Sequence, residues 1–123
     1  MNAGREPIIS ARRPHEGVAV LAVHAAEISS AETIERLGRQ LRHALEAADV
    51  SAFVLDLSDV RFLTSAALGM ILNIRAHLAD RDCWLALAAA SGEVARVLAL
   101  ARLAEVLPVC PTVPEAVAAV RAC

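Results

Sequence analysis

The sequence contains no lysine and no tyrosine, and only 2% of its 123 residues are aromatic. All 12 basic residues are arginines, and together with 14 acidic residues they give a formal net charge of −2. Proteins that bind nucleic acid need a basic surface and often stack bases on aromatic rings. Because only Phe53, Phe62 and Trp84 could stack on bases, we expect no nucleic-acid partner.

Long apolar runs are also absent, although 57% of the residues are hydrophobic. A membrane-spanning helix needs about 20 consecutive apolar residues. Every apolar run in this chain is interrupted by a charged residue or a glycine well before that length. The first seven residues lack the apolar core of a signal peptide. We therefore expect no membrane insertion and a cytoplasmic location.

Cysteine and glycine are sparse and widely spaced. The three cysteines at 83, 110 and 123 form neither a Cys-x-x-Cys pair nor an even disulfide framework, which suits a reducing compartment. The five isolated glycines form no phosphate-binding loop, and the four histidines lack metal-binding spacing. No pattern indicates paired catalytic carboxylates. We therefore predict no metal, no cofactor and no enzymatic activity.

A chain of this length is sufficient for one domain with a hydrophobic core. Strands and helices alternate in the order β-β-α-β-α-β-α-β-α, which predicts an α/β fold. Two fully apolar segments, Ala52–Leu57 and Trp84–Ala88, predict strands covered on both faces. We assign residues 1–7 to a flexible N-terminus and 8–123 to the domain. The predicted strands are 8–13, 18–23, 52–57, 84–88 and 106–109, and the predicted helices are 30–48, 64–80 and two that begin near 92 and 114.

The segment from Asp56 to Gly69 has the strongest functional pattern. A buried strand ends at Asp56, a polar turn follows, and the hydroxyls of Thr64 and Ser65 open the longest predicted helix. Free N–H groups and the helix dipole favour an anion such as a phosphoryl group at this place. A hydroxyl there also serves commonly as a simple N-cap. The local pattern leaves both roles open.

The run from Val54 to Leu72 resembles the signature of the STAS domain family, as found in anti-sigma factor antagonists. A strand, an Asp-Leu-Ser turn, an aromatic residue, a hydroxyl-bearing cap and a Leu-Gly pair all fall in register. The segment from Leu107 to Ala116 resembles the last strand and helix of that family. The resemblance implies a single STAS-like domain, with a mixed β-sheet of about five strands and about four helices.

The resemblance also implies a function in partner switching. The unphosphorylated antagonist would bind an anti-sigma factor, often a serine/threonine kinase, and so free a sigma factor. Phosphorylation at the helix start would end that binding, because it adds about −1.5 to −2 charge to the contact surface. A phosphatase is a further implied partner. We expect the protein to be a monomer or a weak dimer.

One departure from the family pattern affects the phosphorylation site. The family commonly has Asp-Ser-Ser/Thr-Gly-Leu-Gly, whereas this chain has Thr64-Ser65-Ala66-Ala67-Leu68-Gly69. Ala66 occupies the usual place of the phosphate acceptor. Ser65 is therefore our first choice for phosphorylation and Thr64 is our second. Ala67 replaces the usual glycine, which predicts an added methyl group on a surface that a partner approaches closely.

Helical spacing predicts a docking surface on the same helix. Small and weakly polar residues, with His77 at the far end, recur at helical intervals opposite Leu68, Ile71, Leu72 and Leu78. The loop 27–30 is expected at the same edge of the domain. An ordinary solvated or packed helix face is the alternative interpretation. The predicted partner-binding residues are Glu27, Ser29, Thr64, Ser65, Ala66, Gly69, Met70 and Asn73.

Two alternative functions stay open. The first is a STAS accessory subunit that docks permanently on the ATPase of a lipid-transport ABC complex. The second is a nucleotide-sensing or ligand-sensing domain in which the helix N-terminus holds a phosphate. The absence of a glycine-rich loop counts against the second.

Overall fold

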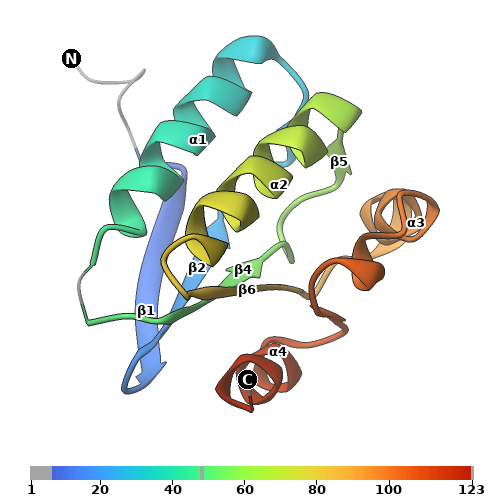
Figure 1. Cartoon of the computed structure of the whole chain (residues 1–123). Coiled ribbons are helices and arrows are strands. Elements are labelled where there is room, and N and C mark those ends of the chain that lie inside the picture. The colour runs from blue at the N-terminus through green and yellow to red at the C-terminus, as the bar shows by residue number, and fades with distance from the viewer. Residues whose placement is uncertain (1–6, 48, 123) are drawn as a thin grey trace.

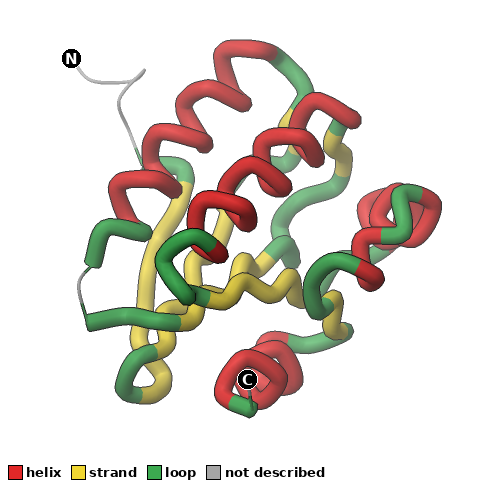
Figure 2. The backbone as a smooth tube through the Cα atoms, in the orientation of Figure 1, coloured by secondary structure: helices red, strands yellow, loops and turns green. Residues whose placement is uncertain are grey.

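The computed structural model describes residues 7–47 and 49–122. In these ranges the elements follow the predicted alternation, with two additional two-residue strands (Figure 1 and Figure 2). The predicted flexible segment 1–7 lies, apart from Pro7, outside the described residues, and its flexibility stays a prediction. The strands are β1 (Ile9–His15), β2 (Val18–Val23), β3 (Glu27–Ile28), β4 (Ala52–Asp56), β5 (Phe62–Leu63), β6 (Trp84–Ala88) and β7 (Val109–Cys110), and the helices are α1 (Ala31–Ala44), α2 (Ser65–Ala79), α3 (Gly92–Leu100) and α4 (Val113–Arg121), with a short 3-10 helix at Leu103–Glu105.

Five strands form one mixed sheet in the order β1-β2-β4-β6-β7. β1 runs antiparallel to β2, and the other pairs in this sheet are parallel. β4 and β6 lie inside the sheet, as their uninterrupted apolar sequences predicted. The described residues therefore confirm the predicted α/β fold, with a five-stranded mixed sheet and four α-helices.

The two faces of the sheet are covered by different helices (Figure 1). Large apolar side chains of α1, α2 and α3, such as Leu37, Ile71 and Leu98, pack on one face around Phe53 and Leu87. In the described part of the chain, α4 is the helix that covers the other face. There the contact is built from small side chains: Val18, Val20, Ala52, Val54, Ala86 and Ala88 of the sheet, and Ala116, Val117 and Val120 of α4.

Three elements differ most from their predicted ranges. The first helix ends at Ala44 rather than near residue 48, because the chain turns there and brings Val50 into the core. Residue 48 itself lies outside the described residues. The first strand continues through Pro14 to His15, because Gly17, with a φ of +80°, closes the hairpin in a tight turn. The last strand is only Val109–Cys110.

Two short strands form a second, small parallel sheet. Glu27 pairs with Phe62, and Ile28 pairs with Leu63. This sheet fixes the entry to α2 against the segment that precedes α1. Within the described part of the chain, no helix has both the length and the apolar character that crossing a membrane requires.

Candidate partner-binding site

Thr64 is the N-cap of α2. Its backbone is extended, and its Oγ1 accepts a hydrogen bond of 3.3 Å from the Ala67 N–H. The Thr64 N–H donates to the Ile28 carbonyl at 3.2 Å, which ties the cap to β3. Thr64 is half-buried by these contacts. The capping role that the sequence left open between two hydroxyls therefore belongs to Thr64.

Ser65 is the first residue of α2 and is exposed. Its hydroxyl forms no hydrogen bond with any described residue. The first turn of α2 contains no acidic side chain, so its free N–H groups have no carboxylate beside them. A phosphoryl group on Ser65 would meet the positive end of the helix dipole.

The exposed face of α2 follows the predicted stripe at most positions, His77 included. Ala66, Gly69 and Asn73 are exposed as predicted, and a Cβ built on Gly69 would meet no atom within 4 Å. The prediction that Met70 lies on this stripe is wrong, because Met70 is only 9% exposed and belongs to the main core. The prediction that Leu72 is buried is also wrong, since Leu72 is 37% exposed.

Helical geometry explains this difference. Met70 lies three residues after Ala67 and four before Ile74, and both neighbours are buried. Ala67 itself is 0% exposed, so its methyl group fills the core and adds nothing to the docking surface. The expectation that Ala67 obstructs a partner is therefore corrected.

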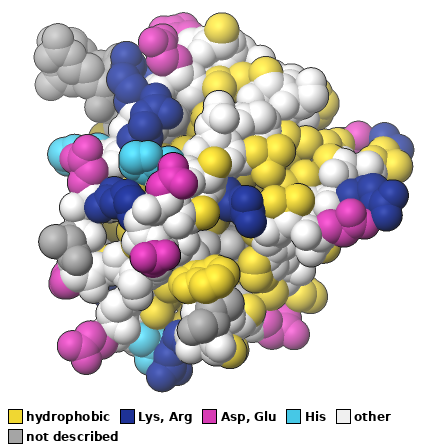
Figure 3. Space-filling view, in the orientation of Figure 1, with side chains coloured by type: hydrophobic (Ala, Val, Ile, Leu, Met, Phe, Trp, Pro, Cys, Tyr) yellow, Lys and Arg dark blue, Asp and Glu magenta, His cyan; other side chains and the backbone are white. Residues whose placement is uncertain are grey.

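The loop 27–30 lies at the same edge as the start of α2, as predicted. The Ala26 carbonyl accepts hydrogen bonds from the Arg61 and Phe62 N–H groups at 2.7 and 3.1 Å. Glu27 and Ser29 are exposed, whereas Ile28 is buried between them. Hydrophobic side chains also gather over the region between α2 and α3 (Figure 3). We call the following residues the α2 surface: Glu27, Ser29, Phe62, Ser65, Ala66, Gly69, Leu72 and Asn73.

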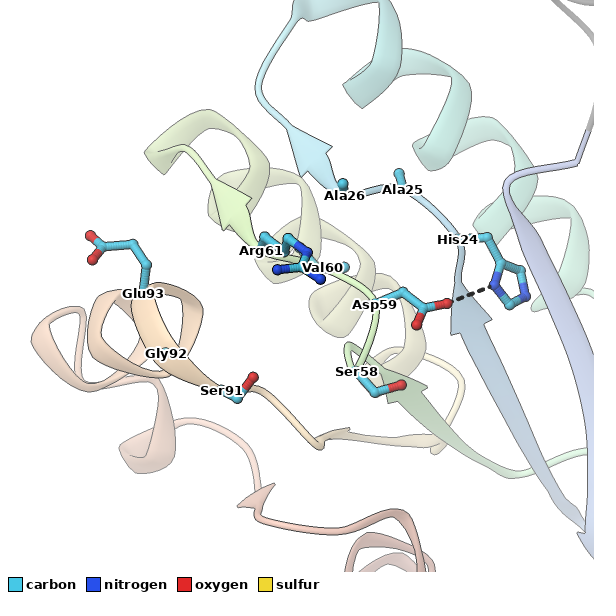
Figure 4. Close-up of a pocket in the computed structure, with 10 residues that line it drawn as sticks. All are labelled: His24, Ala25, Ala26, Ser58, Asp59, Val60, Arg61, Ser91, Gly92 and Glu93. Carbon is cyan, nitrogen blue, oxygen red and sulfur yellow. Dashed lines mark hydrogen bonds and ion pairs between the residues drawn. The ribbon is translucent and has the colours of Figure 1, made fainter.

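A separate cavity of about 620 Å³ opens where β2, β4 and β6 end (Figure 4). His24 and Asp59 point toward each other at its wall, and their Nδ1 and Oδ2 atoms are 3.2 Å apart. His24 Nε2 also lies 2.7 Å from Ser10 Oγ on β1. No sequence pattern indicated this cluster, because its members are far apart in the chain and form no motif.

The charges at this cavity are mixed. Arg61 and the start of α3 supply positive potential, whereas Asp59 and Glu93 are acidic. The Arg96 guanidinium donates to the Glu93 carboxylate at 2.9 Å and holds the pKa of that carboxyl below its usual range. The cavity therefore does not select for an anion by charge alone. Among the described residues, no group of three or more His, Cys, Asp or Glu side chains could hold a metal ion.

Comparisons with known proteins agree with this geometry. Residues 12–116 match the model of a family described as the STAS domain. The structure of an anti-sigma factor antagonist from Mycobacterium paratuberculosis is 30% identical, with 92% of this chain and 94% of that chain covered and a TM-score of 0.71. A candidate anti-sigma factor antagonist from Thermotoga maritima is 26% identical, with 83% and 87% covered and a TM-score of 0.71.

A more distant match shares the fold alone. The phosphorylated form of the Bacillus cell fate determinant SpoIIAA is 17% identical, with 92% of this chain and 99% of that chain covered and a TM-score of 0.66. A comparison with curated protein sequences found no match.

Proposed function

Because the chain belongs to the STAS domain family, we propose that it is an anti-sigma factor antagonist, which binds an anti-sigma factor through its α2 surface and thereby releases a sigma factor. The observation that carries the proposal is the exposed, unbonded Ser65 hydroxyl at the start of α2. In this role the protein acts by binding and needs no catalytic group or cofactor of its own.

The composition of the α2 surface supports a protein partner. Between Ser65 and Asn73 the helix contains no charged residue. A partner can therefore bury the helix part of this surface without removing water from a charge, and Glu27 in the preceding loop is the one charged residue of the α2 surface. Phe62 and Leu72 are exposed beside the small residues and offer apolar area for the contact.

Phosphorylation of Ser65 would act as the switch. The phosphate would be stabilised in the free protein by the N–H groups of the first turn, whereas a bound partner would have to desolvate it. Thr64 suits this role less well, because its hydroxyl already caps the helix and is half-buried. The kinase would be the anti-sigma factor itself, and a phosphatase would reverse the modification.

Phosphate mapping tests the switch. We expect the cognate anti-sigma kinase and ATP to add one phosphate, which mass spectrometry locates on Ser65 and which is absent from Ser65→Ala. Phosphate on Thr64, or phosphate that persists in Ser65→Ala, would contradict the assignment. A subunit docked permanently on the ATPase of an ABC complex would leave Ser65 unmodified under every condition.

The cavity at the ends of β2, β4 and β6 supports ligand sensing as a second candidate function. Its volume of about 620 Å³ is within the range of small-molecule sites. Titration with ATP or GTP, followed by amide shifts of Ser58–Arg61 and Ser91–Glu93, tests this candidate. Shifts that saturate and disappear in Arg61→Ala would support it, and unchanged spectra at millimolar nucleotide would exclude these ligands.

A further inference from the structure

Among the residues that the structure describes, β1 is an edge strand of the sheet, with β2 on one side and no strand on the other. The His24 N–H donates to the Ile8 carbonyl at 2.7 Å, so Ile8 and His24 form a hydrogen-bonded pair. Such pairs recur at every second residue of an antiparallel ladder, and the next two are therefore Ser10/Ala22 and Arg12/Val20. The intervening residues, Ile9 and Ala11, therefore direct their backbone N–H and C=O groups away from β2. These groups offer a template for a further extended strand.

A groove of about 270 Å³ runs between this edge strand and α4. Its floor contains apolar side chains of α4, among them Pro114, Val117 and Ala118. Three basic side chains surround the floor: Arg12 and His15 from β1, and Arg121 from α4. None of the described residues that line the groove is acidic.

The two arginines of the groove are available to a ligand. Neither Arg12 nor Arg121 forms an ion pair or a side-chain hydrogen bond with another described residue. By contrast, Arg13, the next residue of β1, is paired with Asp49 at 2.6 Å. Glu115, the acidic residue of α4, accepts a hydrogen bond from the Thr112 hydroxyl and is not part of the lining.

We propose that this groove binds an extended acidic peptide segment of a partner protein. The peptide backbone would pair with the open edge of β1, and its acidic side chains would lie beside Arg12 and Arg121. The apolar side chains that alternate with the acidic ones would lie on the opposite face of the sheet, on the side of Ile9, because successive side chains of a strand point to opposite faces. The occupant is thus an acidic strand of alternating polarity.

The structure disfavours other occupants. A second copy of β1 would bring the arginines of two strands together, and like charges opposite each other destabilise a strand pair. A membrane surface is attracted by clusters of about four to eight basic residues, whereas this groove has three. A volume of about 270 Å³ lies below the range of sites that enclose a whole drug-sized ligand, but it accommodates side chains of a strand.

This groove is separate from the α2 surface. α4 and α2 lie on opposite faces of the sheet (Figure 1). A peptide beside α4 would therefore leave the start of α2 free, and the protein could hold two partners at once. The inference does not depend on the proposed anti-sigma function.

Fluorescence anisotropy with a defined probe tests the proposal. The probe is a labelled six-residue peptide that alternates valine and glutamate, and its matched control alternates valine and lysine. We expect the acidic peptide to bind the full chain, and Arg12→Glu or Arg121→Glu to weaken it at least about tenfold. Arg81→Glu is the charge-matched control in an exposed loop after α2, and it should change the affinity less than about twofold.

Two further measurements identify the mode of binding. The double variant Arg12→Glu/Arg121→Glu should prefer the lysine peptide, which shows that charge selects the ligand. Saturation with the acidic peptide should slow hydrogen exchange of the Ile9 and Ala11 amides at least about tenfold in the original chain. If the double variant does not fold, Arg12→Gln/Arg121→Gln takes its place in the anisotropy assay, with weakened acidic-peptide binding expected.

Several results would overturn the proposal. One is the absence of acidic-peptide binding at about 1 mM, and another is an equal loss of affinity in Arg81→Glu. Binding to phosphatidylserine vesicles that depends on Arg12 and Arg121, without peptide binding, would identify a lipid site instead. A dimer in sedimentation that Arg12→Glu dissociates would identify a second copy as the occupant.

Discussion

At the scale of single residues, two adjacent hydroxyls have different environments. Thr64 caps α2 and contacts β3, whereas Ser65, one residue later, projects from the first turn without a partner among the described residues. The sequence could not separate these roles, because both residue types make good caps and both stand before the same helix. The backbone conformation distinguishes the two residues, because Thr64 has the extended conformation of an N-cap whereas Ser65 is already part of the helix.

Substitution of the two hydroxyls by alanine should therefore affect stability differently. Thr64→Ala removes the cap of α2 and is expected to lower the free energy of unfolding by about 1 kcal/mol. Ser65→Ala removes an exposed hydroxyl and should change it by less than about 0.5 kcal/mol. Urea unfolding of both variants measures the difference. Equal losses would show that the two hydroxyls share the capping role.

A negative charge at Ser65 should weaken the proposed partner contact. Ser65→Asp is expected to reduce affinity for the anti-sigma factor at least about tenfold, or about 1.4 kcal/mol, because the carboxylate must lose its water in the complex. Calorimetry measures the affinity. The matched control is Ser51→Asp at the start of β4, at the opposite end of the strand from this site, and it should bind normally. Unchanged affinity in Ser65→Asp would remove the start of α2 from the interface.

Gly69 allows a test in which stability and binding change in opposite directions. It lies inside α2, where alanine is favoured by about 0.5–1 kcal/mol, and an added Cβ has no neighbour within 4 Å. Gly69→Ala should therefore raise the free energy of unfolding and, if the partner approaches closely, weaken the complex. Urea unfolding and calorimetry on the same variant measure both effects. Stabilisation with unchanged affinity would place Gly69 outside the contact.

At the scale of elements, α2 shows where sequence periodicity stops being informative. Its position and length were predicted to within a residue or two, since caps and apolar spacing mark both ends. Its exposed face was predicted correctly at most positions but not at Met70 and Leu72, because apolar residues occur around most of the helix and blur the border between the two faces. Met70 and Leu72 were exchanged for this reason. β3 and β5 were missed because two residues are too few to show a period.

The corrected positions of Met70 and Leu72 predict opposite effects for their substitution by alanine. Met70→Ala leaves a cavity in the core and should lower the free energy of unfolding by about 2–5 kcal/mol, while the remaining folded protein binds the anti-sigma factor normally. Leu72→Ala truncates a side chain that is 37% exposed, so it should cost less stability than Met70→Ala and should weaken binding. Denaturation and affinity measurements on this pair test the assignment. Weak binding by folded Met70→Ala, with normal binding by Leu72→Ala, would restore the sequence prediction for these two residues.

At the scale of the whole molecule, the high alanine content has a structural reason. The face under α4 is built from alanine and valine, so a single helix packs close to the sheet. The other face uses leucine, isoleucine and phenylalanine under α1, α2 and α3. The alternation of strands and helices was enough to predict the α/β class. It could not show that Ser10, His24 and Asp59 meet, because the sheet brings those residues together from distant parts of the chain.

The close packing of α4 predicts that this interface will not accept a larger side chain. Ala86 is 0% exposed at the centre of the small-residue face, and Ala86→Leu should lower the free energy of unfolding by about 1–3 kcal/mol through overpacking. Ala66→Leu on exposed α2 is the matched control and should leave stability nearly unchanged. Because the sheet separates α4 from α2, folded Ala86→Leu should bind the anti-sigma factor normally, whereas Ala66→Leu should bind more weakly. Urea unfolding combined with calorimetry measures both properties, and weak binding by folded Ala86→Leu would show that the two faces are coupled through the sheet.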